Sequence, residues 1–268
     1  MRITLLTRLV GLALAVVLIF SCGKKTEVYQ SEPLSNYYPL ATGKYITYRL
    51  DSTVFTNFGH NTVVHKYQVK HVIESATTDN LGRLSYRVYR YIRDSVNAQS
   101  WTPVQPWITN GSYFVTPLPD QIEVIEDNLR FIKLHLPITT GFSWKGNKYL
   151  PFDPYKSFYN FSADDFMDDW DYVYGDLANE MIGQAVVNDV RTVNYDIKDA
   201  SSNMINNHPL VDTSYAFNTF GLDKYAKNIG LVYREYILWE HQNNPTGPNT
   251  YNPFNTGFSL KMWMIDHN

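Results

Sequence analysis

The chain has 268 residues with 23 basic and 26 acidic side chains, so its net charge is −3 and nothing in it favours nucleic acid as a partner. Aromatic residues make up 15% of the chain and include 21 tyrosines, a composition that suits the half-buried surface of a β-sheet. The single cysteine excludes an intramolecular disulfide and a cysteine-ligated metal cluster, whereas the length is sufficient to bury a full core in one domain.

Residues 1–21 have the pattern of a secretory signal peptide. Arg2 and Arg8 form a short positive region, an uninterrupted apolar run follows at Leu9–Phe20, and the small residue Ser21 ends the segment. A helix of that apolar run would be about 18 Å long, well short of the ~30 Å hydrocarbon core of a bilayer. We therefore expect a signal peptide rather than a permanent transmembrane helix.

The segment Ile19–Cys22 (IFSC) resembles the lipobox of bacterial lipoproteins. The resemblance implies that Cys22 is diacylated on sulfur, for example with palmitate, and becomes the new amino terminus. Two acyl chains make a stable membrane anchor. We expect residues 22–36 to be this lipidated terminus and a short flexible tether, and the protein to be held in the bacterial envelope at the outer membrane. The alternative is an ordinary signal peptide followed by an incidental cysteine.

Residues 45–93 predict a three-stranded antiparallel meander. Apolar and polar side chains alternate from Tyr45 onward, which is the pattern of a strand with one buried face. The alternation places strands at residues 45–51, 62–75 and 84–93, separated by turns at 57–61 and 77–83.

Residues 101–119 are expected to be largely irregular. Four prolines interrupt this segment, and proline is disfavoured in central strands, so we expect one short strand at 112–116. A hairpin follows at residues 121–136, with Asp127 and Asn128 as its turn and a buried Trp144 in the loop after it.

A second irregular region is expected at residues 149–176. Ser162 and Asp165 resemble a capping box, which predicts a short helix at about 163–169. Strands then resume at the positions 181–187, 191–198, 233–240 and 257–265.

The opening at 37–48 (YYPLATGKYITY) and the hairpin at 225–235 (YAKNIGLVYRE) resemble segments of uncharacterised lipoproteins of the Bacteroidetes group. Asn228 stands where that group has glycine, and asparagine tolerates the left-handed turn conformation. Together with the lipobox, the resemblance implies an envelope location and leaves the molecular activity open.

Aromatic residues of the two irregular regions are the candidates for ligand binding. Loops on a rigid sheet often carry binding residues, and these rings are suited to a groove for sugar rings or an apolar ligand. The alternative is that they cap the open ends of the core. The candidates are Trp101, Trp107, Tyr113, Tyr155 and Tyr159.

The clearest concentration of charge is acidic and is a weak candidate for a metal site. Calcium requires six to eight oxygen ligands, but the residue order of an EF-hand is absent, so a solvated acidic helix is the simpler interpretation. The residues are Asp164, Asp165, Asp168 and Asp169. We expect neither a metal nor a cofactor.

No local catalytic motif is present. The nucleophile pattern G-x-S-x-G is missing and the histidines show no metal-ligand spacing, whereas a pair of glycosidase carboxylates would leave no local signature.

We therefore predict a single mainly β domain at residues 37–268, either a curved antiparallel sheet or an open barrel of the lipocalin or lipoprotein-carrier type with one or two short helices. A β-sandwich is the alternative. The predicted function is membrane-anchored, non-enzymatic binding of a hydrophobic ligand, a glycan or an envelope protein. A structural or assembly component and a carboxylate-based glycan hydrolase are the alternatives.

Overall fold

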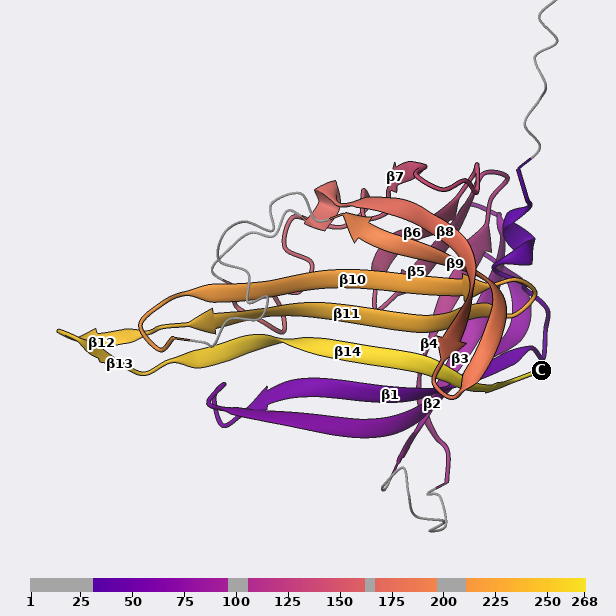
Figure 1. The fold of residues 1–268 in the computed structure, drawn as a ribbon. Helices are drawn as coiled ribbons and strands as arrows, with labels where there is room; N and C mark the ends of the chain where they lie inside the picture. The colour runs from indigo at the N-terminus through magenta and orange to yellow at the C-terminus, as the bar shows by residue number, and fades with distance from the viewer. Residues whose placement is uncertain (1–30, 96–105, 162–166, 197–210) are drawn as a thin grey trace, which may run out of the picture. The chain divides into compact units, whose positions relative to one another are not determined.

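Fourteen strands and two short 3-10 helices form the described part of the chain (Figure 1). The computed structural model describes residues 31–95, 106–161, 167–196 and 211–268, all of which belong to the compact unit Ser31–Asn268. Among these residues no helix is long and apolar enough to span a membrane. The 3-10 helices are η1 (Leu34–Asn36) and η2 (Met167–Asp169).

Twelve of the strands pair into one sheet. Its order is β6-β5-β4-β3-β2-β1-β14-β11-β10-β9-β8-β7, and every pairing is antiparallel. The strands are β1 (Tyr45–Thr56), β2 (Asn61–Thr78), β3 (Leu84–Asp94), β4 (Ile108–Pro117), β5 (Gln121–Glu126), β6 (Leu129–His135), β7 (Ser143–Lys145), β8 (Asp171–Ile182), β9 (Ala185–Asp196), β10 (Ala216–Ala226), β11 (Gly230–Gln242) and β14 (Phe254–His267). The short strands β12 (Pro245–Gly247) and β13 (Thr250–Tyr251) pair separately.

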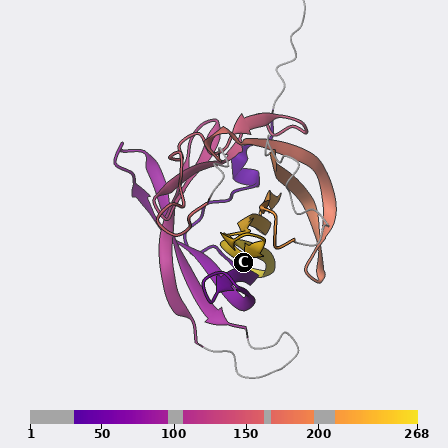
Figure 2. The same ribbon diagram turned by 90° about the vertical axis from the view of Figure 1, so that its left-hand side faces the viewer.

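The sheet wraps into a nearly closed barrel, which Figure 2 shows by looking along the strands. The two edge strands, β6 and β7, approach each other across the opening. The Ile132 amide donates to the Gly146 carbonyl at 2.7 Å, and the Trp144 indole Nε1 donates to the Ile132 carbonyl at 2.9 Å. These bonds join the sheet edges, so the predicted barrel-type fold is confirmed and the β-sandwich is not found.

The side chains of β1, β2 and β3 alternate between the inside and the outside of the barrel. Tyr48, Val69 and Ile73 are buried and face inward, so the residues between them in these strands face outward. The main core lies inside the barrel and continues beneath the segment before β1, where Leu34 and Tyr37 are buried against it. The predicted meander and the buried Trp144 are both confirmed.

Two predicted turns have the expected backbone. Asp127 and Asn128 have positive φ angles of 51° and 64°, as a two-residue hairpin turn requires at both central positions. Asn228 has a φ of 64°, and its amide donates to the Asn36 carbonyl at 2.6 Å. Its left-handed conformation explains why asparagine replaces glycine at this position.

Other expectations from the sequence were wrong. Strand β4 runs through Ile108–Pro117 rather than 112–116, with Gly111 at a bulge opposite β3. Strand β8 begins at Asp171, inside the segment expected to be irregular, and the turn between β8 and β9 falls at Gly183–Gln184. Strand β10 was not predicted beyond its last two residues, which belong to the hairpin expected at 225–235. Most of the expected helix at 163–169 lies outside the described residues.

Candidate functional site

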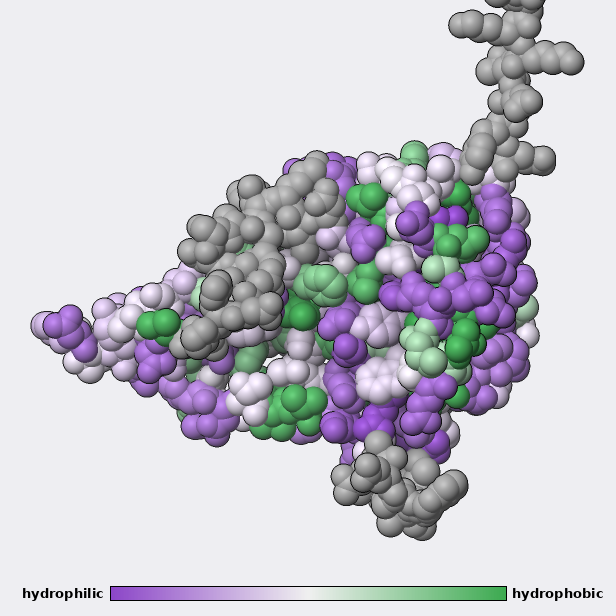
Figure 3. Space-filling view, in the orientation of Figure 1, coloured by the Kyte–Doolittle hydropathy of each residue, from purple (hydrophilic) through white to green (hydrophobic). Residues whose placement is uncertain are grey.

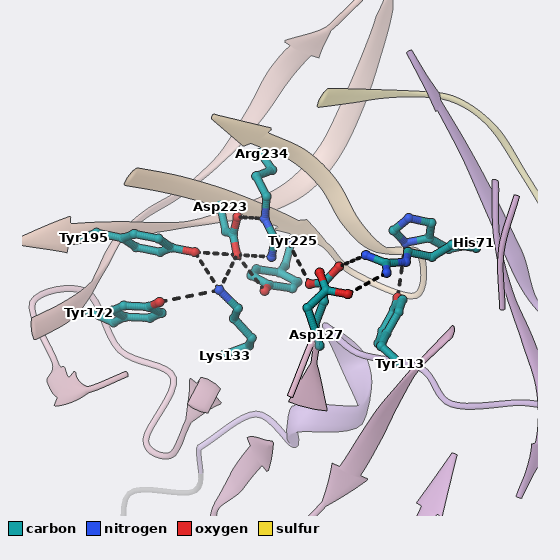
Figure 4. Close-up of polar contacts among 11 residues, drawn as sticks. His71, Tyr113, Asp127, Lys133, Tyr172, Tyr195, Asp223, Tyr225 and Arg234 are labelled. Atoms are coloured by element: carbon teal, nitrogen blue, oxygen red, sulfur yellow. Dashed lines mark hydrogen bonds and ion pairs between the residues drawn. The ribbon is translucent and has the colours of Figure 1, made fainter. Parts of the chain in front are cut away.

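Five ionisable side chains of alternating sign lie in the interior of the barrel, and a sixth, Asp127, continues the series at the exposed β5–β6 turn. We call these six residues the interior charge chain (Figure 4). They come from β3, β5, β6, β10, β11 and the β5–β6 turn, so they connect opposite walls of the barrel. In order of contact they are Lys133, Asp223, Arg234, Glu126, Arg90 and Asp127.

Contacts along the interior charge chain are of two kinds. Arg234 binds Asp223 through two bonds of 2.7 and 2.8 Å, and Arg90 binds Glu126 at 2.7 Å and Asp127 at 2.9 Å. The links from Lys133 to Asp223 and from Arg234 to Glu126 are both 3.9 Å. Every charge therefore has a partner of opposite sign, which is the condition for burying charges at a tolerable cost.

Asp223 is the most enclosed member, with 1% of its surface exposed. Besides Arg234, the hydroxyls of Tyr195 and Tyr225 donate to its Oδ2 at 3.0 and 3.1 Å. Burial opposes ionisation, but Arg234 and Lys133 outweigh it and lower the pKa of the Asp223 carboxyl to about 2. Asp223 therefore stays ionised at neutral pH and is not a general acid there.

The Lys133 ammonium lies beside the hydroxyl groups of Tyr172 and Tyr195. Its Nζ is 2.9 Å from the Tyr195 hydroxyl and 3.5 Å from that of Tyr172, and the two rings stack with centroids 4.0 Å apart. Burial, assisted by the positive charge of Arg234 and opposed by Asp223, lowers the pKa of Lys133 to about 7. Such a shift marks either a functional amine or a structural one, and geometry has to decide between them.

A small pocket lies where the segment before β1 crosses the barrel end. Tyr38, Tyr48, His71 and Tyr113 line its inner part, and its volume is about 50 Å³. His71 Nδ1 is 3.2 Å from the Tyr113 hydroxyl, and burial together with Arg90 and Arg234 lowers the pKa of His71 well below its ordinary range. A neutral imidazole among phenols binds a few ordered waters more readily than a lipid chain.

A second aromatic group lies on the outside of the barrel. We call it the outer aromatic face and define it as Tyr45, Tyr89, Tyr91, Trp107 and Phe114. Register fixes the direction of these residues: Tyr89 and Tyr91 lie opposite Val72 and Lys70 of β2, on the side away from Val69 and Ile73. All five are half-buried, so each ring keeps part of its surface accessible.

Trp107 is held on this face by Arg93. The Arg93 guanidinium carbon is 4.1 Å from the centre of the Trp107 ring, and the guanidinium also donates to Gln68 Oε1 at 2.8 and 2.5 Å. Stacking and bidentate hydrogen bonding fix the orientation of both side chains. No carboxylate of the described residues forms an ion pair with Arg93 among the contacts found.

The candidate residues from the sequence fall in different places. Trp107 is on the outer aromatic face, whereas Tyr113 points inward to His71. Tyr155 and Tyr159 pack on Phe258 with ring centroids 5.4 and 5.5 Å apart, where they cover the core. The structure therefore does not bring these four residues into one groove. Asp168 and Asp169 are exposed, and Trp101, Asp164, Asp165 and Cys22 lie outside the described residues.

The interior charge chain was not identified from the sequence. A weak signal is present: Asp223 and Arg234 lie opposite each other in register at inward positions of their strands, and the buried Tyr225 is near Asp223. Without the strand β10, this position could not be recognised as inward. In the described part of the chain, no three histidine or acidic residues are grouped as metal ligands.

Comparison with known proteins gave one structural similarity of interest. No protein-family model matches the sequence, and no curated protein sequence is significantly similar to it. A crystal structure from Vibrio parahaemolyticus, described as an outer membrane lipoprotein-sorting protein domain, aligns over 85% of both chains with 10% identity and a TM-score of 0.17. At this score the alignment does not establish a common fold, so function rests on the residues of the chain itself.

Proposed function

We propose that this chain is a lipid-anchored protein of the bacterial envelope that binds a glycan on its outer aromatic face without catalysing a reaction. The anchor is Cys22, and residues 37–268 are the binding domain. The observation that carries the proposal is the Trp107 ring held by Arg93 on the outside of a rigid sheet.

The interior is unsuited to an apolar ligand. A carrier of lipid needs a cavity lined mostly by hydrophobic side chains. Here the centre of the barrel is occupied by the interior charge chain and its tyrosine partners, and the pocket beside it, at about 50 Å³, is too small for a lipid chain. The favoured ligand therefore binds outside the barrel.

The same contacts argue against a hydrolase in the interior. A glycosidase needs two carboxylates that face the substrate, one as an acid and one as a base or nucleophile. Arg234 contacts both Asp223 and Glu126, and Arg90 contacts both Glu126 and Asp127. Carboxylates neutralised in this way act as structural partners rather than as an acid–base pair.

The outer aromatic face has the features expected for sugar binding. The faces of sugar rings carry C–H groups that pack onto aromatic rings, and Tyr89 and Tyr91 have ring centroids 6.3 Å apart on the same side of β3. Tyr45 lies on β1, two strands away, which is a separation of about 10 Å. Hydrogen-bonding groups of Gln68, Arg93 and the tyrosines lie beside the rings.

A broad apolar docking surface is less well supported. In the orientation of Figure 3, hydrophobic residues over β10, β11 and β14 lie in small separate patches among polar ones, leaving aside the area under the grey residues. Protein interfaces of the obligate kind generally show a larger continuous apolar patch.

The anchor and the ligand can be tested separately. Cys22→Ala is expected to prevent acylation, so the protein no longer partitions into the detergent phase; a variant that partitions like the wild type would contradict the anchor. The detergent-solubilised full chain is expected to bind at least one member of a glycan panel, and Trp107→Ala to weaken that binding at least tenfold. Tyr149→Ala, which removes an exposed ring from the 149–161 segment, is the matched control.

A further inference from the structure

The outward residues of β1, β2 and β3 carry an excess of positive charge. Pairing in register puts five cations and two carboxylates on this side, although the whole chain has a net charge of −3. The cations are Arg49, Lys66, Lys70, Arg87 and Arg93, and the carboxylates are Asp51 and Glu74. We call this surface, which surrounds the outer aromatic face, the basic rim.

Arg93 is the best-positioned cation of the basic rim. Its Nε and Nη2 donate to Gln68 and its guanidinium stacks on the Trp107 ring, whereas no contact of Nη1 is found among the described residues. An arginine held in this way is pre-organised to donate to an oxyanion, because the conformational cost of orienting it has already been met by Gln68 and Trp107.

Lys70 and Arg87 extend the positive surface on either side of the tyrosines. Lys70 Nζ lies 3.6 Å above the centre of the Tyr45 ring, and no carboxylate contact is found for it among the described residues. Arg87 lies near the rings of Tyr89 and Phe114, and its contact with Glu74 is 3.8 Å long between side chains that are both 44% exposed. A pair of that length and exposure holds Arg87 weakly.

Aromatic rings thus alternate on one face of the sheet with cations whose carboxylate contacts are weak or not found among the described residues. We infer that the ligand of the outer aromatic face is an acidic polysaccharide, whose rings pack on the aromatic side chains while its carboxylate or sulfate groups bind Arg93, Lys70 and Arg87. This inference rests on the proposed glycan-binding function and specifies the ligand class.

An anionic lipid surface would share the charge but fits this geometry less well. Side chains that dock on membranes insert apolar groups below the level of the headgroups. The rings here lie half-buried in the sheet and are covered in part by the cations themselves. Such rings present a surface for stacking and do not protrude as a membrane wedge.

The test uses the full chain in detergent micelles and a panel of matched glycans. Polygalacturonate, alginate and a sulfated chondroitin are the acidic probes, fully methyl-esterified polygalacturonate and dextran are the neutral ones, and anionic phospholipid vesicles are the competing surface. We expect at least one acidic glycan to bind at least tenfold more tightly than the neutral glycans, with an affinity that falls as the salt concentration is raised. Arg93→Gln and Lys70→Gln are each expected to weaken that binding about tenfold.

Lys156→Gln is the matched control, because it removes one exposed positive charge from the 149–161 segment without touching the basic rim. It should bind the acidic glycan like the wild type, and the melting temperature of each variant shows that the fold is intact. Equal binding of acidic and neutral glycans would overturn the acidic specificity and leave glycan binding standing. Binding of none of the glycans would overturn both. Binding of the vesicles by the unacylated Cys22→Ala chain, if Arg93→Gln abolishes it, would assign the basic rim to a membrane instead.

Discussion

Two arginines on the same strand, Arg90 and Arg93, face opposite sides of the barrel and have opposite surroundings. Arg90 points inward and contacts the carboxylates of Glu126 and Asp127 at 2.7 and 2.9 Å. Arg93 points outward, where it stacks on Trp107 and donates to the amide oxygen of Gln68. Both are guanidinium groups of the same strand, but only the inner one contacts carboxylates.

The difference follows from solvation. A charge inside the barrel has lost its water, so it needs a partner of opposite sign within contact distance, and the interior charge chain supplies one for each member. A charge outside keeps water on part of its surface and tolerates the absence of a carboxylate. Pairing inside therefore indicates structure, and unpaired positive charge outside indicates capacity for a ligand.

The largest expected effect comes from breaking the interior charge chain at its centre. Arg234→Met leaves Asp223 and Glu126 without their shared cation, and we expect a loss of about 3–5 kcal/mol in the free energy of unfolding, measured by urea denaturation. The double variant Asp223→Leu with Arg234→Met removes both charges and should recover part of the loss. A loss below ~1 kcal/mol in the single variant would contradict a structural role for this pair.

A matched change outside should have little effect on folding. Arg93→Gln removes the same kind of cation from the same sheet, yet it breaks no ion pair that is found among the described residues. We expect its free energy of unfolding to change by about 1 kcal/mol or less, which is the loss of one exposed cation–π contact and its hydrogen bonds. A loss as large as that of Arg234→Met would remove the distinction between the two sides.

Titration of Lys133 offers a second test of the interior. Its pKa falls from about 10.5 in the unfolded chain to about 7 in the fold, so between these values the unfolded state binds a proton that the folded state does not. The free energy of unfolding should then rise with pH from about 7 to 10, by at most ~1.4 kcal/mol per pH unit. Below pH 7 both states are protonated and Lys133 contributes no slope.

The control for this slope is Lys133→Met, which removes the titrating group. The wild-type curve minus the variant curve should climb between pH 7 and 10 and be flat from pH 5 to 6. A flat difference throughout would mean that Lys133 stays charged in the fold. The difference is needed because the buried tyrosines, whose pKa values burial raises, oppose the rise of each single curve above about pH 10.

How well the sequence predicts which residues face the inside or the outside of the barrel differs from strand to strand. In β1 to β3 the alternation of apolar and polar residues is regular, so the meander and its outward tyrosines follow from the pattern. Around β4 the prolines and Gly111 concealed the first part of the strand, and Tyr113 was grouped with Trp107 although the structure turns it inward. In β10 the polar residues on both faces concealed the strand and Asp223 with it.

The interior charge chain could not be predicted from the sequence for a physical reason. Its members are far apart in the chain, and their partnership depends on the closure of the sheet, which brings β6 and β10 to one interior. Local patterns report which residues share a face, but not which opposite wall they meet. The sequence likewise shows the outer arginines. It does not show that they lack carboxylate partners, because that depends on how the strands pair.

The smallest expected effect tests the weakest contact of the basic rim. Glu74 is one of its two carboxylates, and its 3.8 Å contact with the exposed Arg87 should contribute less than ~0.5 kcal/mol to the free energy of unfolding. Glu74→Gln removes a negative charge and releases Arg87, so an acidic glycan should bind about two- to threefold more tightly, an effect that shrinks as salt is raised. Weaker binding of the acidic glycan by Glu74→Gln would contradict the basic rim as the site of recognition. If Glu74→Gln instead lost as much stability as Arg234→Met, the Arg87–Glu74 pair would have the same structural role as the interior ion pairs.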